Sequence, residues 1–75
     1  MEIEADDFWD DMKWGEKNYP KLMRQYPEKW VAIVNKTVVG VGKSISEAER
    51  EAYKKTGIEI KRIPVIFVER GANIY

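Results

Sequence analysis

The sequence predicts an α+β fold: an N-terminal helical region and a three-stranded sheet with one crossover helix. Three observations carry this prediction. Lys29–Val34 and Ile63–Glu69 are apolar on both faces, as strands covered on both sides are. Two polar residues separate the first of them from another apolar run, which is the spacing of a tight hairpin. The segment from Ser44 to Gly57 has helix-capping residues at both ends. The predicted order is α(α)-β-β-α-β.

The first third of the chain predicts two short helices. Asp6 or Asp7 is expected to cap the first, after a flexible start at residues 1–5. Because a proline inside a helix costs about 3 kcal/mol, Pro20 predicts a break near residues 18–19 and a second helix that begins with it. Pro27 ends that helix. The apolar residues at helical spacing are Phe8, Met12, Tyr19, Leu22 or Met23, and Tyr26.

Residues 29–42 predict a hairpin. Its strands are Lys29–Val34 and Thr37–Gly42, joined by the two residues Asn35 and Lys36. In the second strand Gly40 and Gly42 predict a bend or a close approach of another backbone. Side chains of the first strand alternate between two faces, with Trp30, Ala32 and Val34 on one and Val31 and Ile33 on the other.

The next segment predicts a helix that runs to about Thr56. Its N-terminus fits two capping boxes, Ser46 with Glu49 or Ser44 with Glu47. Lysines in the last turn and a following glycine suit its C-terminus. We expect its buried face to consist of Ile45, Ala48, Ala52 and Tyr53.

A connector at residues 58–62 leads to the third strand. In that strand Val65 and Phe67 are expected on one face and Ile66 and Val68 on the other. A right-handed crossover lays this strand beside the first, which gives the sheet order 2-1-3. Both faces then need cover. Either the two helical regions take opposite faces, or both take one face and a second copy of the chain covers the other.

Composition excludes several classes of function. The chain has no histidine and no cysteine, and so lacks the commonest general base and metal ligands. We therefore expect no enzyme, no catalytic residue, no cofactor and no metal centre. Charged residues make up 35% of the chain, which is typical of proteins from thermophiles. No signal peptide and no apolar run of membrane-spanning length is present, so a cytoplasmic location is expected.

The balanced net charge hides an asymmetry. Residues 1–16 carry seven acids and one base, for a net charge of −6, and residues 17–75 carry the opposite, +6. Either the acidic arm docks on its own basic body, or it is an interaction surface. Four acids of the arm have helical spacing and are candidate ligands of Mg²⁺ or Ca²⁺, although acids at a helix start are ordinary: Asp6, Asp7, Asp10 and Asp11.

The strings Tyr19-Pro20-Lys21-Leu22-Met23 and Tyr26-Pro27-x-Lys29-Trp30-Val31-Ala32-Ile33-Val34, then Ser46-Glu47-Ala48, carry a family resemblance. The chain resembles a domain-of-unknown-function family of very small archaeal and bacterial proteins. The resemblance covers residues 18–70 and implies the helix-hairpin-helix-strand layout with no established activity. The length of the chain predicts a single domain over 1–75, made of an acidic arm at 1–17, which lies outside the resemblance, this core and a tail at 71–75. Some members accompany other small domains, which suggests partnership.

Two functions are therefore considered. The first is a non-enzymatic protein-interaction or regulatory module that self-associates, as a dimer for example, or binds a partner protein at an open sheet edge. Its candidate contact residues are Phe8, Trp9, Asp10 and Trp14. The alternative is a nucleic-acid-binding protein that uses the basic body, with the acidic arm as a competitor. Its candidate residues are Lys17, Lys21, Arg24, Lys29 and Lys36.

Overall fold

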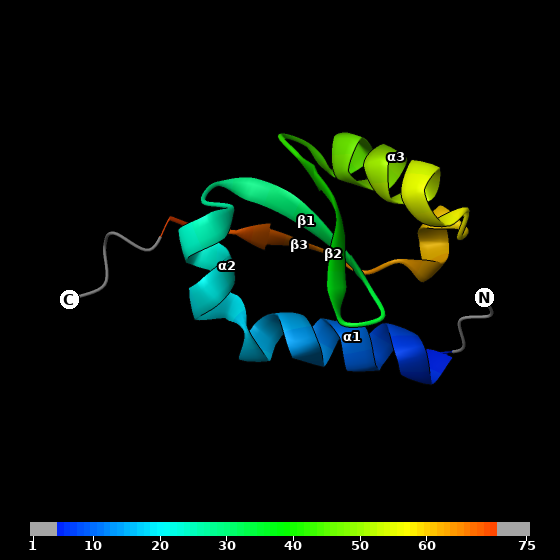
Figure 1. Ribbon diagram of the computed structural model, residues 1–75, viewed down its shortest axis with the longest axis horizontal. Helices are drawn as coiled ribbons and strands as arrows, with labels where there is room; N and C mark the ends of the chain where they lie inside the picture. The colour runs from blue at the N-terminus through cyan, green and yellow to red at the C-terminus, as the bar shows by residue number, and fades with distance from the viewer. Residues whose placement is uncertain (1–4, 71–75) are drawn as a thin grey trace.

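The elements follow the predicted order, as the computed structural model in Figure 1 shows. The structure describes residues 5–70, and side chains from Phe8 onward. The first four residues of the expected flexible start and the expected tail at 71–75 lie outside the described residues. α1 begins at Ala5, so Asp6 and Asp7 lie inside the helix, and the prediction that one of them caps it is wrong. The elements are α1 (Ala5–Lys17), α2 (Tyr19–Gln25), β1 (Lys29–Val34), β2 (Thr37–Gly42), α3 (Ile45–Thr56), the 3₁₀ turn η1 (Ile60–Arg62) and β3 (Val65–Val68).

The helix break lies where the sequence predicts it. α1 ends at Lys17 and α2 begins at Tyr19, with Pro20 in the first turn of α2. Asn18 between them donates to the carbonyl oxygen of Trp14 twice, from its backbone N–H at 2.9 Å and from its side-chain amide at 2.8 Å, and so closes the last turn of α1. Among the described residues, no helix has the length and apolar character needed to cross a membrane.

The sheet has the predicted order, β2-β1-β3, with β1 in the centre. β1 pairs antiparallel with both neighbours, so β2 and β3 run in the same direction, as a crossover connection requires. Ile33 pairs with Val38 and Ala32 with Gly40, which leaves Val39 as the extra residue of a β-bulge. The fold class predicted from the sequence is confirmed.

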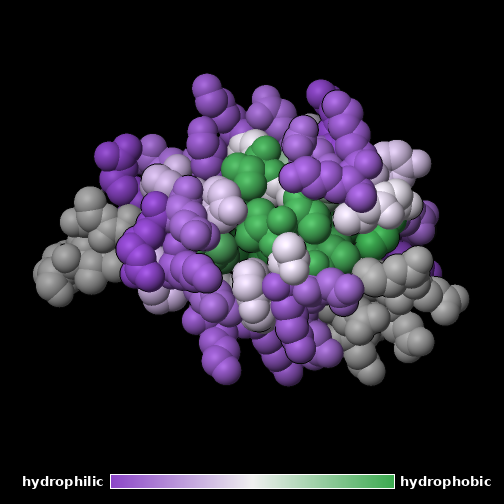
Figure 2. All heavy atoms as spheres, viewed as in Figure 1, coloured by the Kyte–Doolittle hydropathy of each residue, from purple (hydrophilic) through white to green (hydrophobic). Residues whose placement is uncertain are grey.

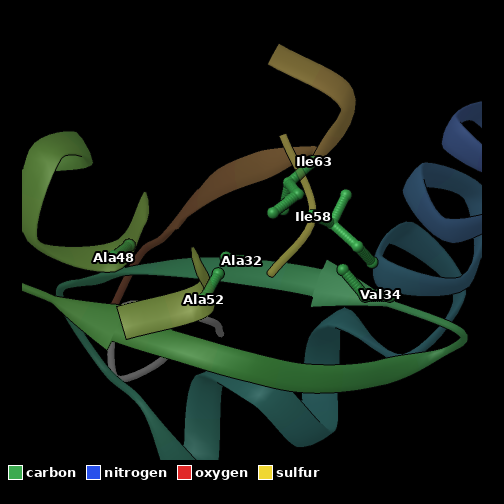
Figure 3. Close-up of a cluster of buried hydrophobic side chains, with 6 residues drawn as sticks. All are labelled: Ala32, Val34, Ala48, Ala52, Ile58 and Ile63. Carbon is green, nitrogen blue, oxygen red and sulfur yellow. The ribbon is translucent and has the colours of Figure 1, made fainter. Parts of the chain in front are cut away.

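The two faces of the sheet hold separate apolar clusters, and helices cover both. Figure 3 shows the cluster under α3, which consists of Ala32, Val34, Ala48, Ala52, Ile58 and Ile63. The cluster on the other face consists of Leu22, Val31, Ile33 and Val68, with Trp14, Tyr19, Met23 and Tyr26 of α1 and α2 packed against it. The helical regions therefore take opposite faces, and neither face needs a second copy of the chain.

α3 lies almost on the backbone of β2. A Cβ atom on Gly40 would lie 2.2 Å from the carbonyl oxygen of Ala48, and one on Gly42 would lie 2.4 Å from the Cβ of Glu47. The predicted close approach at these glycines is confirmed. It also explains an error, because so close a helix buries only a narrow stripe. Ile45 is 44% exposed and Tyr53 is 53% exposed, so the prediction that they belong to the buried face is wrong.

The capping of α3 uses the second of the two predicted registers. Ser44 is the N-cap, and its hydroxyl accepts a hydrogen bond from the backbone N–H of Glu47 at 3.2 Å. The carboxylate of Glu47 in turn accepts from the backbone N–H of Lys43 at 2.9 Å. Gly57 ends the helix with a φ of 72°, the left-handed conformation that glycine adopts without strain.

Candidate interaction surface

The outer edge of β2 presents unpaired backbone groups. In an antiparallel sheet, alternate residues of a central strand direct their N–H and C=O groups to opposite neighbours. Ile33 donates to the carbonyl oxygen of Pro64, so Ile33 and Val31 face β3. Their partners in β2 are Val38 and Val41, whose own groups must then point away from β1. This edge offers two donors and two acceptors to an added strand.

The edge of β3 is partly blocked. Tyr19 of α2 reaches it with its hydroxyl, which donates to the carbonyl oxygen of Phe67 at 3.1 Å and accepts from the backbone N–H of Glu69 at 2.8 Å. Both groups lie on the side of β3 that faces away from β1. The strand is also only four residues long and begins after Pro64. Of the two edges, β2 is therefore the more accessible.

The surface around β2 is apolar. Figure 2 shows apolar side chains gathered in the middle of one face, where β2 runs in Figure 1, within a border of hydrophilic side chains. Val38, Val39 and Val41 are all half-buried, and no residue from Val38 to Gly42 is charged. Natural edge strands usually carry a charge or a proline that prevents pairing with other chains. The bulge at Val39 twists this strand but leaves both outward residues open.

Carboxylates border this edge on the side of α3. Glu47 lies over Gly42, as the close approach of its Cβ shows, and Glu51 follows one helical turn later on the same flank. Both side chains are exposed. An extended chain added to β2 would therefore pass beneath two negative charges.

Asp11 ties α1 to the turn between β1 and β2. It is 4% exposed, and its two carboxylate oxygens accept hydrogen bonds from the backbone N–H groups of Asn35 at 3.0 Å and Lys36 at 2.9 Å. Asn35 and Lys36 have φ values of 57° and 56°, as a type I′ hairpin turn requires. The predicted two-residue turn is thus present. Asp11 supplies a stabilisation that the turn residues alone do not have.

A cleft of about 360 Å³ lies between α1 and this turn. Its lining combines an aromatic ring, one carboxylate and three ammonium groups, from Asp10, Lys13, Trp14, Lys17 and Lys36. Trp14 is half-buried, since part of its ring packs on the cluster around Ile33. The cleft thus gathers several basic side chains around an aromatic ring.

The candidate partner-binding residues of α1 separate into two groups. Trp9 is 59% exposed, and its ring meets that of Phe8 edge-to-face with centroids 5.4 Å apart. Asp10 and Trp14 instead line the cleft beside the hairpin turn. α1 therefore does not present these four residues as one surface.

The candidate nucleic-acid residues also divide. The structure brings Lys17 and Lys36 together in the cleft, whereas Lys21, Arg24 and Lys29 lie outside its lining. Sequence reasoning missed Lys13, which belongs to the acidic arm. The four-residue spacing of Lys13 and Lys17 places them on one helix face, and that signal was available in the sequence. Their meeting with Lys36 depends on the tertiary contact at Asp11.

The acidic candidates for metal ligands do not form a ligand set where the structure describes them. Asp11 uses both oxygens on the hairpin turn, and Asp10 faces the cleft. The side chains of Asp6 and Asp7 lie outside those described. Within the described residues, no group of three or more acidic side chains is placed to hold a metal ion.

A second concavity, of about 520 Å³, lies between α3 and η1. Its surface is mainly apolar, with Tyr53 and Ile60 exposed in it. Its charged rim is partly neutralised, because the ammonium group of Lys61 lies 3.6 Å from the carboxylate of Glu59. Its charges therefore indicate no particular ligand.

Comparison with known proteins finds a family match for the region that contains the sheet edge and the hairpin turn. A family of unknown function, DUF5678, matches residues 21–71, more than half of the chain. The chain belongs to DUF5678. The family resemblance found in the sequence is confirmed, and the DUF5678 region includes α2 except for its first two residues, the whole sheet and α3. α1, with Asp11 and four of the five lining residues of the cleft, precedes it. No curated protein and no solved structure matches the chain.

Proposed function

We propose that this DUF5678 protein is a non-enzymatic interaction module that binds an extended segment of a partner protein as a fourth strand beside β2. The observation that carries the proposal is the outward orientation of the backbone groups of Val38 and Val41 on an uncharged, apolar edge. In strand addition, main-chain hydrogen bonds supply affinity and alternate side chains supply specificity. The Tyr19 hydroxyl on β3 leaves β2 as the favoured edge.

The position of α3 favours a foreign segment over a second copy of the chain. Antiparallel pairing of two β2 strands about a twofold axis would place both copies of α3 on the same face of the joined sheet. Because α3 lies directly over Gly40 and Gly42, the two helix axes would be separated by little more than the ~4.8 Å between strands. Packed helices need about 8–10 Å. The proposed partner therefore contributes a strand with no helix over it.

The charges at the edge suggest the chemistry of that strand. One face of an added strand would meet the flank of α3, where Glu47 and Glu51 are exposed. The other residues would extend the apolar surface around Val38 and Val41. A segment that alternates apolar and basic residues satisfies both conditions, because strand side chains alternate between faces. This is the class of partner that the proposal names.

Two synthetic peptides of equal length test the proposal. One alternates valine with lysine, and the other alternates valine with glutamate. The first should bind the full chain in calorimetry at low salt, and the second should bind at least about tenfold more weakly, a difference of ~1.4 kcal/mol from like-charge repulsion at the α3 flank.

A matched pair of variants separates strand addition from surface adsorption. Val41→Pro removes an outward N–H that the sheet does not use, and edge strands tolerate such a proline. Val41→Thr keeps the N–H and a β-branched side chain. The proline variant should lose binding of the valine–lysine peptide while the threonine variant retains it. Equal binding by both variants would refute strand addition at β2.

A further inference from the structure

We infer that the cleft between α1 and the hairpin turn is a binding site for a nucleoside phosphate. Lys13, Lys17 and Lys36 would hold the phosphate, and the ring of Trp14 would stack on the base. The same chemistry is offered by a free nucleotide and by one unit of a single-stranded nucleic acid. This site is distinct from the β2 edge, so it adds a second binding activity to the proposed one.

The three lysines gather in the cleft although their charges repel one another. Lys13 and Lys17 lie one helical turn apart, a spacing at which like charges destabilise a helix, while Asp10 and Glu16 lie three residues from Lys13 and offset that repulsion. The hairpin turn brings Lys36 to the same cleft, where Asp11 fixes its backbone. Lys17 lies in the last turn of α1, where a positive charge interacts favourably with the helix dipole. The same interaction does not account for Lys13 or Lys36. Within the part of the chain that the structure describes, no ion pair shorter than 4.0 Å involves any of the three.

The volume of the cleft suits one nucleotide. Its volume of about 360 Å³ is at the lower end of small-ligand sites, which span roughly 300–1,000 Å³. Trp14 is anchored on one side by the apolar cluster around Ile33 and Leu22, so its position is fixed before a ligand arrives. An anchored indole beside ammonium groups is the combination that binds unpaired bases without reading their sequence.

The acidic arm therefore forms part of the binding site and does not compete with its ligand. The alternative derived from the sequence treated it as a competitor of nucleic acid, yet α1 supplies Lys13, Trp14 and Lys17 to the site. Only Asp10 adds a negative charge to the lining, which leaves its formal charge at +2, from three lysines and one aspartate. Neutralising Asp10 should strengthen phosphate binding, and neutralising an acid of α1 outside the lining should not.

Nuclear magnetic resonance titration tests the site with three probes at low salt: inorganic phosphate, adenosine 5′-monophosphate and a short single-stranded oligoadenylate. The readout is the indole N–H signal of each tryptophan. Trp14 should shift with the nucleotide and the oligoadenylate, while Trp30, which packs on the α3 side of the sheet, should stay in place. Equal affinity for inorganic phosphate and the nucleotide would overturn stacking on Trp14, and no binding by either nucleotide probe would overturn the site.

Charge variants locate the phosphate. Lys17→Gln and Lys36→Gln should each weaken binding roughly fivefold, as expected for an exposed charge pair at about 4 Å. Each should also lower the salt slope for the oligoadenylate by about one. Lys54→Gln on α3 is the matched control and should change neither. Asp10→Asn should strengthen binding, with Glu16→Gln as its control. Equal losses from all three lysine variants would overturn the site in favour of diffuse attraction.

The relative affinities identify the source of the ligand. If oligoadenylate binds far more tightly than the mononucleotide, and both depend on Lys36, the site takes single-stranded nucleic acid. Comparable affinities with the same dependence identify a free nucleotide. Either result supports the inference, because both require the cleft.

Discussion

Oδ1 of Asp11 accepts a hydrogen bond from the backbone N–H of Lys36 at 2.9 Å, which joins α1 to the hairpin turn 25 residues later. The second oxygen of the same carboxylate accepts from Asn35. A nearly buried acid thus stabilises a turn made without glycine, in which both central residues have positive φ. Both the sheet edge and the cleft depend on this contact, because β2 begins at Thr37 and Lys36 lines the cleft.

Asp11→Ala should lower the free energy of unfolding by about 1.5–3 kcal/mol, the usual range for hydrogen bonds to a charged group. The substitution removes the only side-chain acceptor shown for two turn N–H groups among the described hydrogen bonds. Urea unfolding followed by circular dichroism measures the loss. Asp10→Ala is the matched control, since Asp10 is exposed, and it should stay within about 0.5 kcal/mol of the parent. Equal effects would contradict the role given to Asp11.

Gly40→Ala should destabilise the fold by about 3 kcal/mol or more, at the upper end of the range for overpacking. The new Cβ would meet backbone atoms of Ala48 and Ala52, which cannot move aside as a flexible side chain would. Gly57→Ala is the comparison, because that glycine has open space around it and a positive φ. It should cost only about 1–2 kcal/mol. Thermal unfolding of both variants checks the order, and a milder effect at Gly40 would refute the close packing of α3 on β2.

Tyr19→Phe should open the edge of β3. The hydroxyl that binds the Phe67 carbonyl and the Glu69 N–H is lost, while the ring still packs on the second cluster. Amide hydrogen exchange at Glu69 should accelerate, and the free energy of unfolding should fall by about 0.5–1.5 kcal/mol. Unchanged exchange at Glu69 would show that the hydroxyl does not protect this edge.

Sequence reasoning succeeded where a local pattern decides the structure. The break before Pro20, the strand faces around Trp30 and the cap at Gly57 follow from residue chemistry within a few positions. It failed at Ile45 and Tyr53, since their exposure depends on how close α3 lies to β2.

The candidate sites were harder to predict because they also depend on contacts between distant parts of the chain. The residues of the cleft come from α1 and from a turn far along the chain. The contact that joins them is a hydrogen bond between a side chain and a backbone, which leaves no periodic signal in the sequence. Likewise, the open edge at β2 follows from the sheet order, but the blocked edge at β3 depends on the reach of Tyr19.

Arg70→Gln should raise the pKa of Glu28. The Arg70 guanidinium donates two hydrogen bonds to that carboxylate, at 3.1 and 3.2 Å, and together with its positive charge holds the pKa of Glu28 below its usual value. A carboxyl with a lowered pKa stabilises the folded state at neutral pH, and the contribution is lost as pH falls through that pKa. Carbon-13 titration of the Glu28 carboxyl measures the shift. An unchanged pKa in the variant would show that the pair does not persist in solution.

Amide hydrogen exchange at Val38 and Val41 tests the central claim, that the outward groups of β2 receive an added strand. In the free chain both amides should exchange quickly, because neither is used within the sheet. With the valine–lysine peptide at saturation they should slow by at least about tenfold, as N–H groups that enter a ladder do, while the outward Phe67 amide on β3 stays unchanged. Unaltered exchange at Val38 and Val41 in a peptide-saturated sample, or slowing at Phe67 instead, would contradict the account.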